Sequence, residues 1–446
     1  MDVEGQLKVQ IYGLSLLLGC ACWAQTGEYE GPSILSRNKS LTGERAGKLL
    51  DFRFYGEVTG IYDDGLTPVS VQPNGSVLNP GAQEGIEAGF GVIGSRQWKN
   101  DFLSVDYHGA FRDYTSKSYY DGTDQFFDLE YGRQIARHVS LTLTGTAGSL
   151  SRSSGVFSFA SLRDTDLFAV PANELFDNRT MYVQPGATLV WQKTRRLSLS
   201  VGGDGFLVRR RSSALAGLDG GRARVDAAYR LDRRQTLSAS YDLTDFSYQG
   251  AFGHALMHSF AGGYGVGLGR MWDFSSMFGA IRISTAGVTN VTVDPAIAAI
   301  VGHTTATVAF FKTSWLPLID ARLIRRFQKA SLAFNFTHGV SPGNGVFLAS
   351  SQNAAAANYS YAGYRRFTFG GTAGYSDLNS FGQGIGKYSN LQGGAGLTYK
   401  VSGPLHMEFR YDARHYTTQN RLYSKNENRV TLGLAFSPGE VPLSIF

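Results

Sequence analysis

Charged residues occupy alternate positions in two stretches of the chain. The first stretch contains Arg222, Arg224, Asp226 and Arg230, and the second contains Glu408, Arg410, Asp412 and Arg414. Side chains at a spacing of two lie on one face of an extended strand. A row of charges on such a face can pair with neighbouring strands, or create an electrostatic field that acts on passing ions and polar solutes.

Other patterns that could support chemistry are weak. Glycines recur at every second position from Gly263 to Gly269, but no helical pattern follows them, so they do not fit a nucleotide-binding loop. His254 and His258 come nearest to a metal-ligand pair, and their strand context favours solvated side chains. Both cysteines, Cys20 and Cys22, lie near the N-terminus, away from the body of the chain. We predict no catalytic residue, no metal site and no cofactor, and we expect that the protein is not an enzyme.

The elements that must position the charged rows are long strands. The chain has 55 Gly, 13% aromatic residues and only 17% charged residues, which favours many strands joined by glycine-rich turns. Its alternating runs are longer than the ~5 to 6 residues usual in soluble strands. Charges lie in the middle of the polar faces, as a watery lumen permits. No stretch of ~18 apolar residues is present, which argues against membrane helices.

We therefore predict an all-β fold, a closed antiparallel transmembrane β-barrel of about 18 strands, with about 16 as the alternative, because bacterial barrels close with an even number. The predicted strands are centred in residues 51–62, 84–96, 100–114, 121–134, 137–150, 180–193, 195–210, 221–232, 234–247, 256–270, 272–286, 313–326, 329–339, 353–365, 366–378, 387–402, 404–416 and 427–437.

Short connections alternate with longer loops along the predicted barrel. Several short connections are basic, such as residues 193–196 and 325–329. If the short turns face the periplasm, both ends of the barrel face it too. Trp98, Trp191 and Trp272 lie at or beside short turns, where amphipathic rings are expected at the level of the lipid headgroups.

Residues 1–24 have the features of a secretory signal peptide. An apolar core from Ile11 to Leu18 precedes small residues and Ala24, the expected cleavage point. The segment ending at Cys20 also resembles a lipoprotein cleavage box, which is the alternative. We expect residues 25–50 to form a periplasmic N-terminal segment and residues 51–446 to form the barrel.

These alternating strands and connections resemble bacterial outer-membrane β-barrels, porins in particular, from about Asp51 to the end of the chain. The apolar and aromatic run from Val430 to Phe436 and the terminal Phe446 are similar to the final strand that barrel-assembly machinery recognises, although Pro438 and Pro442 interrupt strand pairing between them. The resemblance implies location in the bacterial outer membrane. It also implies outer-membrane lipid, lipopolysaccharide and barrel-assembly machinery as partners.

The predicted pore-lining residues are charged residues on the polar faces of three strands: Arg222, Arg224, Asp226, Arg230, Asp320, Arg322, Glu408, Arg410, Asp412 and Arg414. Other charges, including Arg112 and Glu87, share the polar faces. The two signs nearly balance, so no ion preference follows. Side chains that only solvate and cross-link the wall are the alternative.

Two loops, 151–179 and 286–312, exceed what a connection needs, and long loops are usually functional or disordered. In the second, Asp294 and Pro295 form a helix-start signature, and apolar residues including Ile297 and Ile300 follow. We take these four residues as a candidate constriction loop. Contact with lipopolysaccharide or a partner is the alternative.

The predicted function is a porin-like channel for passive or substrate-selective diffusion of small polar solutes, because an 18-strand barrel leaves an aqueous lumen. A gated transporter would need a plug domain, and the segment between Gln25 and Asp51 is too short for one. The alternative is a non-enzymatic barrel component of an envelope machine, for polysaccharide secretion or surface assembly. The net charge of +6 is spread along the chain, so no nucleic-acid partner is expected, while a homo-oligomer stays open.

Overall fold

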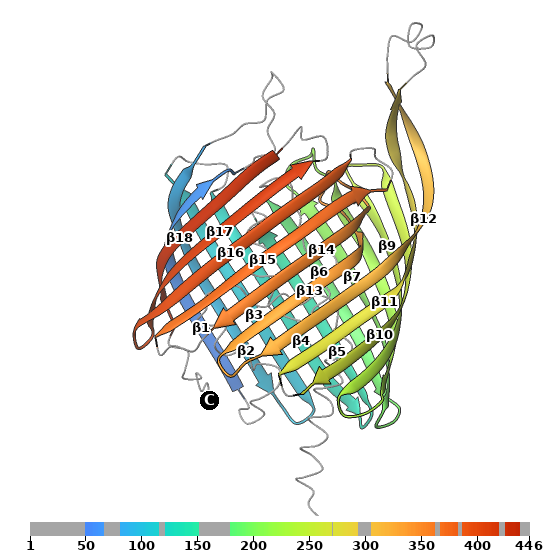
Figure 1. Cartoon of the computed structure of the whole chain (residues 1–446), viewed down its shortest axis with the longest axis horizontal. Coiled ribbons are helices and arrows are strands. Elements are labelled where there is room, and N and C mark those ends of the chain that lie inside the picture. The colour runs from blue at the N-terminus through green and yellow to red at the C-terminus, as the bar shows by residue number, and fades with distance from the viewer. Residues whose placement is uncertain are drawn as a thin grey trace, which may run out of the picture.

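The structure, a computed structural model, describes residues 50–66, 81–115, 121–150, 179–269, 271–292, 305–361, 366–381, 386–418 and 424–437. In these ranges the strands form a single antiparallel sheet (Figure 1). Within the same ranges, the chain has no helix long and apolar enough to cross a membrane. The predicted signal peptide and nearly all of the predicted periplasmic segment lie outside the described residues.

The sheet has 18 strands. Their bounds are β1 (Leu50–Asp64), β2 (Gln83–Gln97), β3 (Asp101–Tyr114), β4 (Gly122–Ala136), β5 (Val139–Leu150), β6 (Thr180–Gln192), β7 (Leu197–Arg210), β8 (Gly217–Arg230), β9 (Gln235–Gln249), β10 (Gly253–Leu268), β11 (Trp272–Thr292), β12 (Thr305–Arg326), β13 (Ala330–Ser341), β14 (Ser350–Tyr361), β15 (Phe367–Ser380), β16 (Lys387–Ser402), β17 (Leu405–Thr418) and β18 (Ser424–Phe436).

The strands close into a ring. β1 pairs with β2 along one edge and with β18 along the other, from Gly56 opposite Phe436 to Asp64 opposite Asn428. The remaining pairings join strands that are consecutive in the chain. The predicted closed antiparallel barrel of 18 strands is thereby confirmed, and the alternative of 16 is wrong. This is the architecture that the resemblance to porin-like outer-membrane barrels implies.

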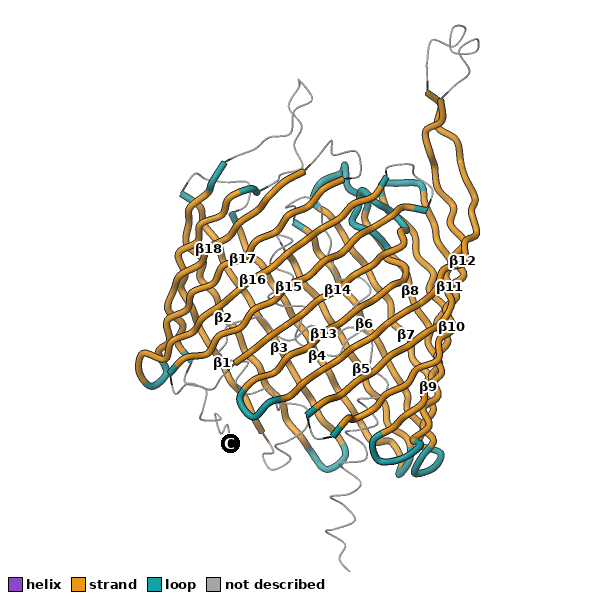
Figure 2. Tube along the Cα trace, in the orientation of Figure 1, coloured by secondary structure: helices purple, strands orange, loops and turns teal. Residues whose placement is uncertain are grey.

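The two ends of the barrel carry different connections (Figure 2). Short turns follow the even-numbered strands; in the first of them, the Trp98 backbone N–H donates to the Asp101 carbonyl at 2.8 Å. The connections after the odd-numbered strands are mostly longer. Leu50, at the start of β1, pairs with Arg96 beside the first short turn. β18 ends at Phe436, opposite Leu405 of β17, which follows the last short turn. Both ends of the barrel therefore lie at its short-turn end.

The β11–β12 hairpin is longer than the sequence analysis predicts, and it rises above the rim of the barrel (Figure 1). Segment 286–312, expected to be a loop, contributes paired arms that run from Gly287 opposite Phe310 to Thr292 opposite Thr305. Valine and threonine are frequent in both arms, and β-branched residues favour strands. The prediction ends the first strand too early and begins the second too late. It assigns the β-branched residues that flank the turn to the loop.

The outer surface of the ring is apolar. Ile86 on β2, Val201 on β7 and Phe278 on β11 are each more than half exposed, and similar side chains recur on other strands. The side chains between them point inward, because successive residues of a strand face opposite sides. Tyr182, for example, is 1% exposed between the outward Met181 and Val183.

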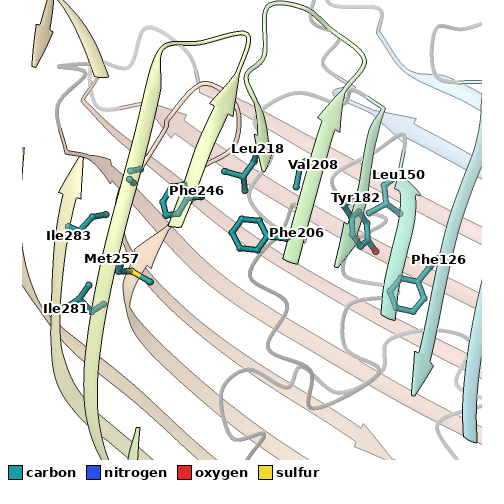
Figure 3. Close-up of a cluster of buried hydrophobic side chains, with 12 residues drawn as sticks. Phe126, Leu150, Tyr182, Phe206, Val208, Leu218, Phe246, Met257, Ile281 and Ile283 are labelled. Carbon is teal, nitrogen blue, oxygen red and sulfur yellow. The ribbon is translucent and has the colours of Figure 1, made fainter. Parts of the chain in front are cut away.

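Buried apolar side chains gather inside the barrel, toward the end with the longer connections. The largest group, here called the apolar zone, spans strands β4 to β11 (Figure 3). It consists of Phe126, Leu150, Tyr182, Phe206, Val208, Leu218, Phe246, Ala255, Met257, Ile281 and Ile283, together with Ala349. A second group joins Phe347, Leu378, Tyr388 and Tyr416. Part of the lumen wall is thus packed like a protein core.

Candidate functional site on the inner wall

The charged row of β8 lies on the inner face of the barrel. Ala223, Val225 and Tyr229 are exposed on the outer face of this strand. Arg222 and Arg224 alternate with them and are largely covered. The period-two pattern therefore places the predicted pore-lining residues of β8 inside the ring.

Ion pairs with both neighbouring strands hold this row against the wall. Nε and Nη2 of Arg222 each lie 2.8 Å from Oδ1 of Asp204 on β7. Nε of Arg224 donates to Asp242 on β9 at 2.6 Å and lies 3.8 Å from Asp226 on its own strand. Charge-assisted hydrogen bonds of this kind are stronger than those between neutral groups. They hold the charged ends of Arg222 and Arg224 in place against the wall.

Arg230, Asp320 and Arg322 keep the inner-face positions of their strands. Arg230 ends β8, where its backbone N–H donates to the carbonyl of Arg196 at 2.8 Å. On β12, Trp315 is 65% exposed on the outer face, and Asp320 and Arg322 lie on the opposite face, half-buried. These two strands supply separate parts of the predicted lining.

The charged row of β17 also lies on the inner face. Nε and Nη2 of Arg410 contact the two carboxylate oxygens of Asp412 at 2.7 and 2.8 Å. Arg414 donates to Asn390 of β16 at 3.0 Å and lies 3.8 Å from Glu427 of β18. The row is therefore cross-linked within β17 and to the strands on both sides.

The β8 and β17 rows occupy opposite walls. β17 is nine places from β8 (17 − 8 = 9) in a ring of 18 strands, so the separation is equal in either direction. Glu408 completes the β17 row, on the inner face between the exposed Met407 and Phe409. Every predicted pore-lining residue thus lies on an inner face, in three groups on β8, β12 and β17. That these residues line a conducting path remains a prediction.

A further charged cluster, here called the seam network, lies on β1 to β4 and β18, around the junction of β1 and β18 that closes the ring. It comprises Asp63, Glu87, Arg112, Asp124 and Arg429. Nη2 of Arg112 lies 2.5 Å from Glu87 and 2.8 Å from Asp124. Nη2 of Arg429 donates to both carboxylate oxygens of Glu87 at 2.9 Å. None of these five side chains is more than 13% exposed.

Sequence reasoning missed the seam network as a unit. It placed Arg112 and Glu87 on the polar face, and the predicted closed barrel pairs the first strand with the last, but it had no means of setting the register of β1 against β18. Asp63 lies one residue beyond the predicted strand 51–62. If the predicted strand is extended by that residue and the first strand is paired with the last in the observed register, Asp63 lies opposite Arg429.

The β13–β14 connection, residues 342–349, reaches across the inside of the barrel. The carbonyl of Gly345 accepts a hydrogen bond from the backbone N–H of Ala216, in the β7–β8 connection, at 3.0 Å. The ring of Phe347, which is 1% exposed, lies 5.8 Å from the ring of Tyr388 on β16, centroid to centroid. One connection therefore contacts two distant parts of the wall across the inside of the barrel.

The sequence of this connection explains its compact shape. Gly343 and Gly345 have φ values of 94° and 86°, a left-handed region that favours glycine. A Cβ on Gly343 would lie 1.8 Å from the carbonyl oxygen of Phe347, and one on Gly345 would lie 2.9 Å from Arg210. The side-chain oxygen of Asn344 accepts the Phe347 backbone N–H at 3.0 Å, as asparagine does in turns.

The candidate constriction residues Asp294, Pro295, Ile297 and Ile300 lie outside the described residues. Within the described part of the chain, residues 342–349 and the β7–β8 connection meet across the inside of the barrel. The sequence analysis did not single out residues 342–349. Their proline, glycine and asparagine signal a turn, but only the tertiary contacts show that the turn points inward.

The described residues contain no group of three or more His, Cys, Asp or Glu side chains that could hold a metal ion. His108 lies 2.5 Å from Asp106 through Nε2, and its Nδ1 lies 2.9 Å from the Tyr55 hydroxyl. This arrangement resembles a hydrogen-bonded catalytic group, but the His108 side chain is 0% exposed. The contact between His108 and Tyr55 joins β3 to β1.

Comparisons with known proteins give distant similarities. No protein-family model matches the sequence, and no curated protein matches it. Among solved structures, the chain is similar to Pseudomonas aeruginosa OpdQ, with 13% identity, coverage of 88% of this chain and 98% of that chain, and a TM-score of 0.42. It is also similar to P. aeruginosa OccK9 (OpdG), with 14% identity, 87% and 98% coverage, and a TM-score of 0.43. A third is P. aeruginosa OccK2 (OpdF) in complex with glucuronate, with 10% identity, 87% and 98% coverage, and a TM-score of 0.44. Similarity at this level assigns neither a substrate nor a pore geometry to this chain.

Proposed function

We propose that this chain is an outer-membrane channel through which small polar solutes diffuse, passively or with selection by the charges of its inner wall. The observation that carries the proposal is a closed ring with an apolar outside and charged rows inside. In hydrocarbon every backbone polar group needs a hydrogen-bond partner within the protein. A closed barrel meets this need because every strand has a neighbour on both sides. A barrel of this strand number leaves an aqueous channel.

The proposal includes the route and orientation of the protein. Residues 1–24 act as a cleaved signal peptide, and residues 25–50 remain in the periplasm. The short turns and both ends of the barrel face the periplasm. Barrel-assembly machinery inserts the chain, and outer-membrane lipid and lipopolysaccharide contact its outer face.

The selectivity of the channel comes from fixed charges on opposite walls. Arg222 and Arg224 on β8 face the β17 row, which includes Glu408 and Asp412. Charges held on rigid strands beside low-dielectric walls act on a passing ion more strongly than charges in bulk water. Residues 342–349 narrow the space above these rows, so that solutes pass close to the wall.

Conductance in a planar bilayer under a salt gradient tests this proposal. The wild-type protein should form open channels. Substituting Arg222→Gln, Arg224→Gln and Arg230→Gln together leaves Asp204 and Asp242 without their arginine partners. The reversal potential should then shift toward that of a cation-selective pore.

A matched variant on the opposite wall should move the reversal potential the other way. Glu408→Gln with Asp412→Asn removes negative charge from β17 and should favour anions. Open channels whose reversal potential is the same in both variants would show that these rows do not line the conducting path. Absence of channels in the inserted wild-type protein would contradict the proposal and favour a barrel component of an envelope machine.

A further inference from the structure

Basic residues crowd the short-turn end of the barrel. The described residues there include Arg96, Lys99, Arg133, Arg137, Lys193, Arg195, Arg196, Arg233, Arg234, Arg325, Arg326 and Lys329. Few acidic residues accompany them; Arg133 lies 3.7 Å from Asp101, and Arg326 lies 3.3 Å from Asp273. Both arginine side chains are still more than 60% exposed. This end is therefore far more basic than the chain as a whole, whose net charge is +6.

Some of these cations lie on the outer face of the ring rather than at the mouth of the lumen. Arg96 follows the exposed Ile86 and Phe90 at even positions of β2. Lys193 lies two residues after the exposed Trp191, just beyond the end of β6. Because alternate residues share a face, these side chains lie on the surface that carries the exposed apolar residues.

Arg325 also lies on the outer face, at an odd position of β12 like the exposed Phe311 and Trp315. Arg96, Lys193 and Arg325 are each held beside a tryptophan ring, and these contacts define three rim pairs. The Arg96 guanidinium lies 4.9 Å from the ring centroid of Trp98. The Lys193 ammonium lies 5.9 Å from that of Trp191. The Arg325 guanidinium lies 4.7 Å from that of Trp272.

The rim pairs combine two features of a lipid interface. Tryptophan rings favour the headgroup level of a membrane, and long cationic side chains extend from apolar surface toward the polar layer. Cation–π contacts keep the three charges at that level. An anionic group that approaches from the outer side of the barrel is the complementary partner. Charges turned toward the lumen mouth would instead suit a solute, and the strand position of Arg96 and the contact of Lys193 with the exposed Trp191 argue against that.

We propose that the three rim pairs bind the phosphate headgroups of anionic phospholipids in the leaflet at the short-turn end. This inference rests on the proposed membrane location. Guanidinium and ammonium groups donate strong hydrogen bonds to phosphate oxygens. Three pairs, on β2, β6 and the β11–β12 hairpin, distribute the contacts around the ring.

Quenching of tryptophan fluorescence by lipids with brominated acyl chains tests the inference. Three of the five tryptophans of the chain belong to rim pairs. In vesicles that mix phosphatidylcholine with phosphatidylglycerol, the relative binding constant of phosphatidylglycerol should exceed that of phosphatidylcholine by about fivefold or more, the factor for a single basic side chain near a charged lipid surface. Raising the salt concentration should reduce this preference.

Two variants with the same loss of charge separate the rim pairs from a general basic field. Arg96→Gln, Lys193→Gln and Arg325→Gln together should bring the relative binding constant close to one. Arg137→Gln, Arg196→Gln and Arg234→Gln together remove three exposed turn charges outside the rim pairs and should leave the preference in place. No preference in the wild-type protein, or equal loss in both variants, would overturn the inference. Absence of quenching by any brominated lipid would instead contradict the membrane location.

Discussion

The apolar zone and the seam network lie on adjoining walls of the same barrel, which meet on β4, and both are buried on its inner face. In the apolar zone, residues from β4 to β11 pack against one another. In the seam network, Arg112 and Arg429 share Glu87, and Arg112 also contacts Asp124. In the apolar zone, the side chains make contacts that any apolar side chain of suitable size could make. The seam network depends on particular charges, each compensated by its neighbours.

The seam network should be the more sensitive region. Arg112→Met would leave Asp124 without its arginine and Glu87 with one cation fewer. Removing one partner of a buried ion pair costs about 3 to 5 kcal/mol, because it leaves a charge uncompensated in a poorly solvated place. Urea unfolding of the protein in lipid vesicles, followed by tryptophan fluorescence, should show a loss of this size.

A second substitution sharpens this test. Arg112→Met combined with Asp124→Asn removes a charge from both members of the pair and should recover a substantial part of the lost free energy. Equal stability of the single and double variants would mean that charge compensation does not govern this wall.

The apolar zone should respond in a simpler way. Leu218 is 4% exposed and packs within the zone. Leu218→Ala should lower the free energy of unfolding by about 2 to 5 kcal/mol, because it removes apolar contacts and leaves a cavity. Leu218→Met keeps the volume and should cost less than about 1.5 kcal/mol. If Leu218→Met is as damaging as Leu218→Ala in the same unfolding experiment, side-chain volume is not what the zone requires.

An exposed pair gives the smallest expected effect. Asp273 and Arg326 lie 3.3 Å apart at the short-turn end, with side chains 49% and 69% exposed. Asp273→Asn should change the free energy of unfolding by only about 0.2 to 1 kcal/mol, and less at high salt, because water screens exposed pairs. A loss as large as that for Arg112→Met would show that burial does not distinguish the two kinds of pair.

The sequence predicts the fold better than the site, for a physical reason. Alternation along β17 is local, so Met407 and Glu408 can be assigned to opposite faces without knowing any partner. The pairing of Arg222 with Asp204 needs the register of β7 and β8, which residues 211–216 of the connection between these two strands must set. The contact of Arg429 with Glu87 needs closure of the whole ring, and the inward course of residues 342–349 needs tertiary contacts with Ala216 and Tyr388. Neither follows from a local pattern.

The β1–β18 pairing has a consequence for how the barrel forms. Gly56 and Phe436 are opposite each other but 380 residues apart in the chain (436 − 56 = 380). The other pairings join consecutive strands, so they can form one hairpin after another with little loss of chain entropy. Bringing the two ends together costs more and must come late. A Cβ on Gly433 would lie 2.4 Å from the carbonyl oxygen of Val58, so any residue other than glycine at that position would force β1 and β18 to shift apart. The rate of assembly therefore depends on a single non-local step, and until that step β1 and β18 both present unpaired backbone edges.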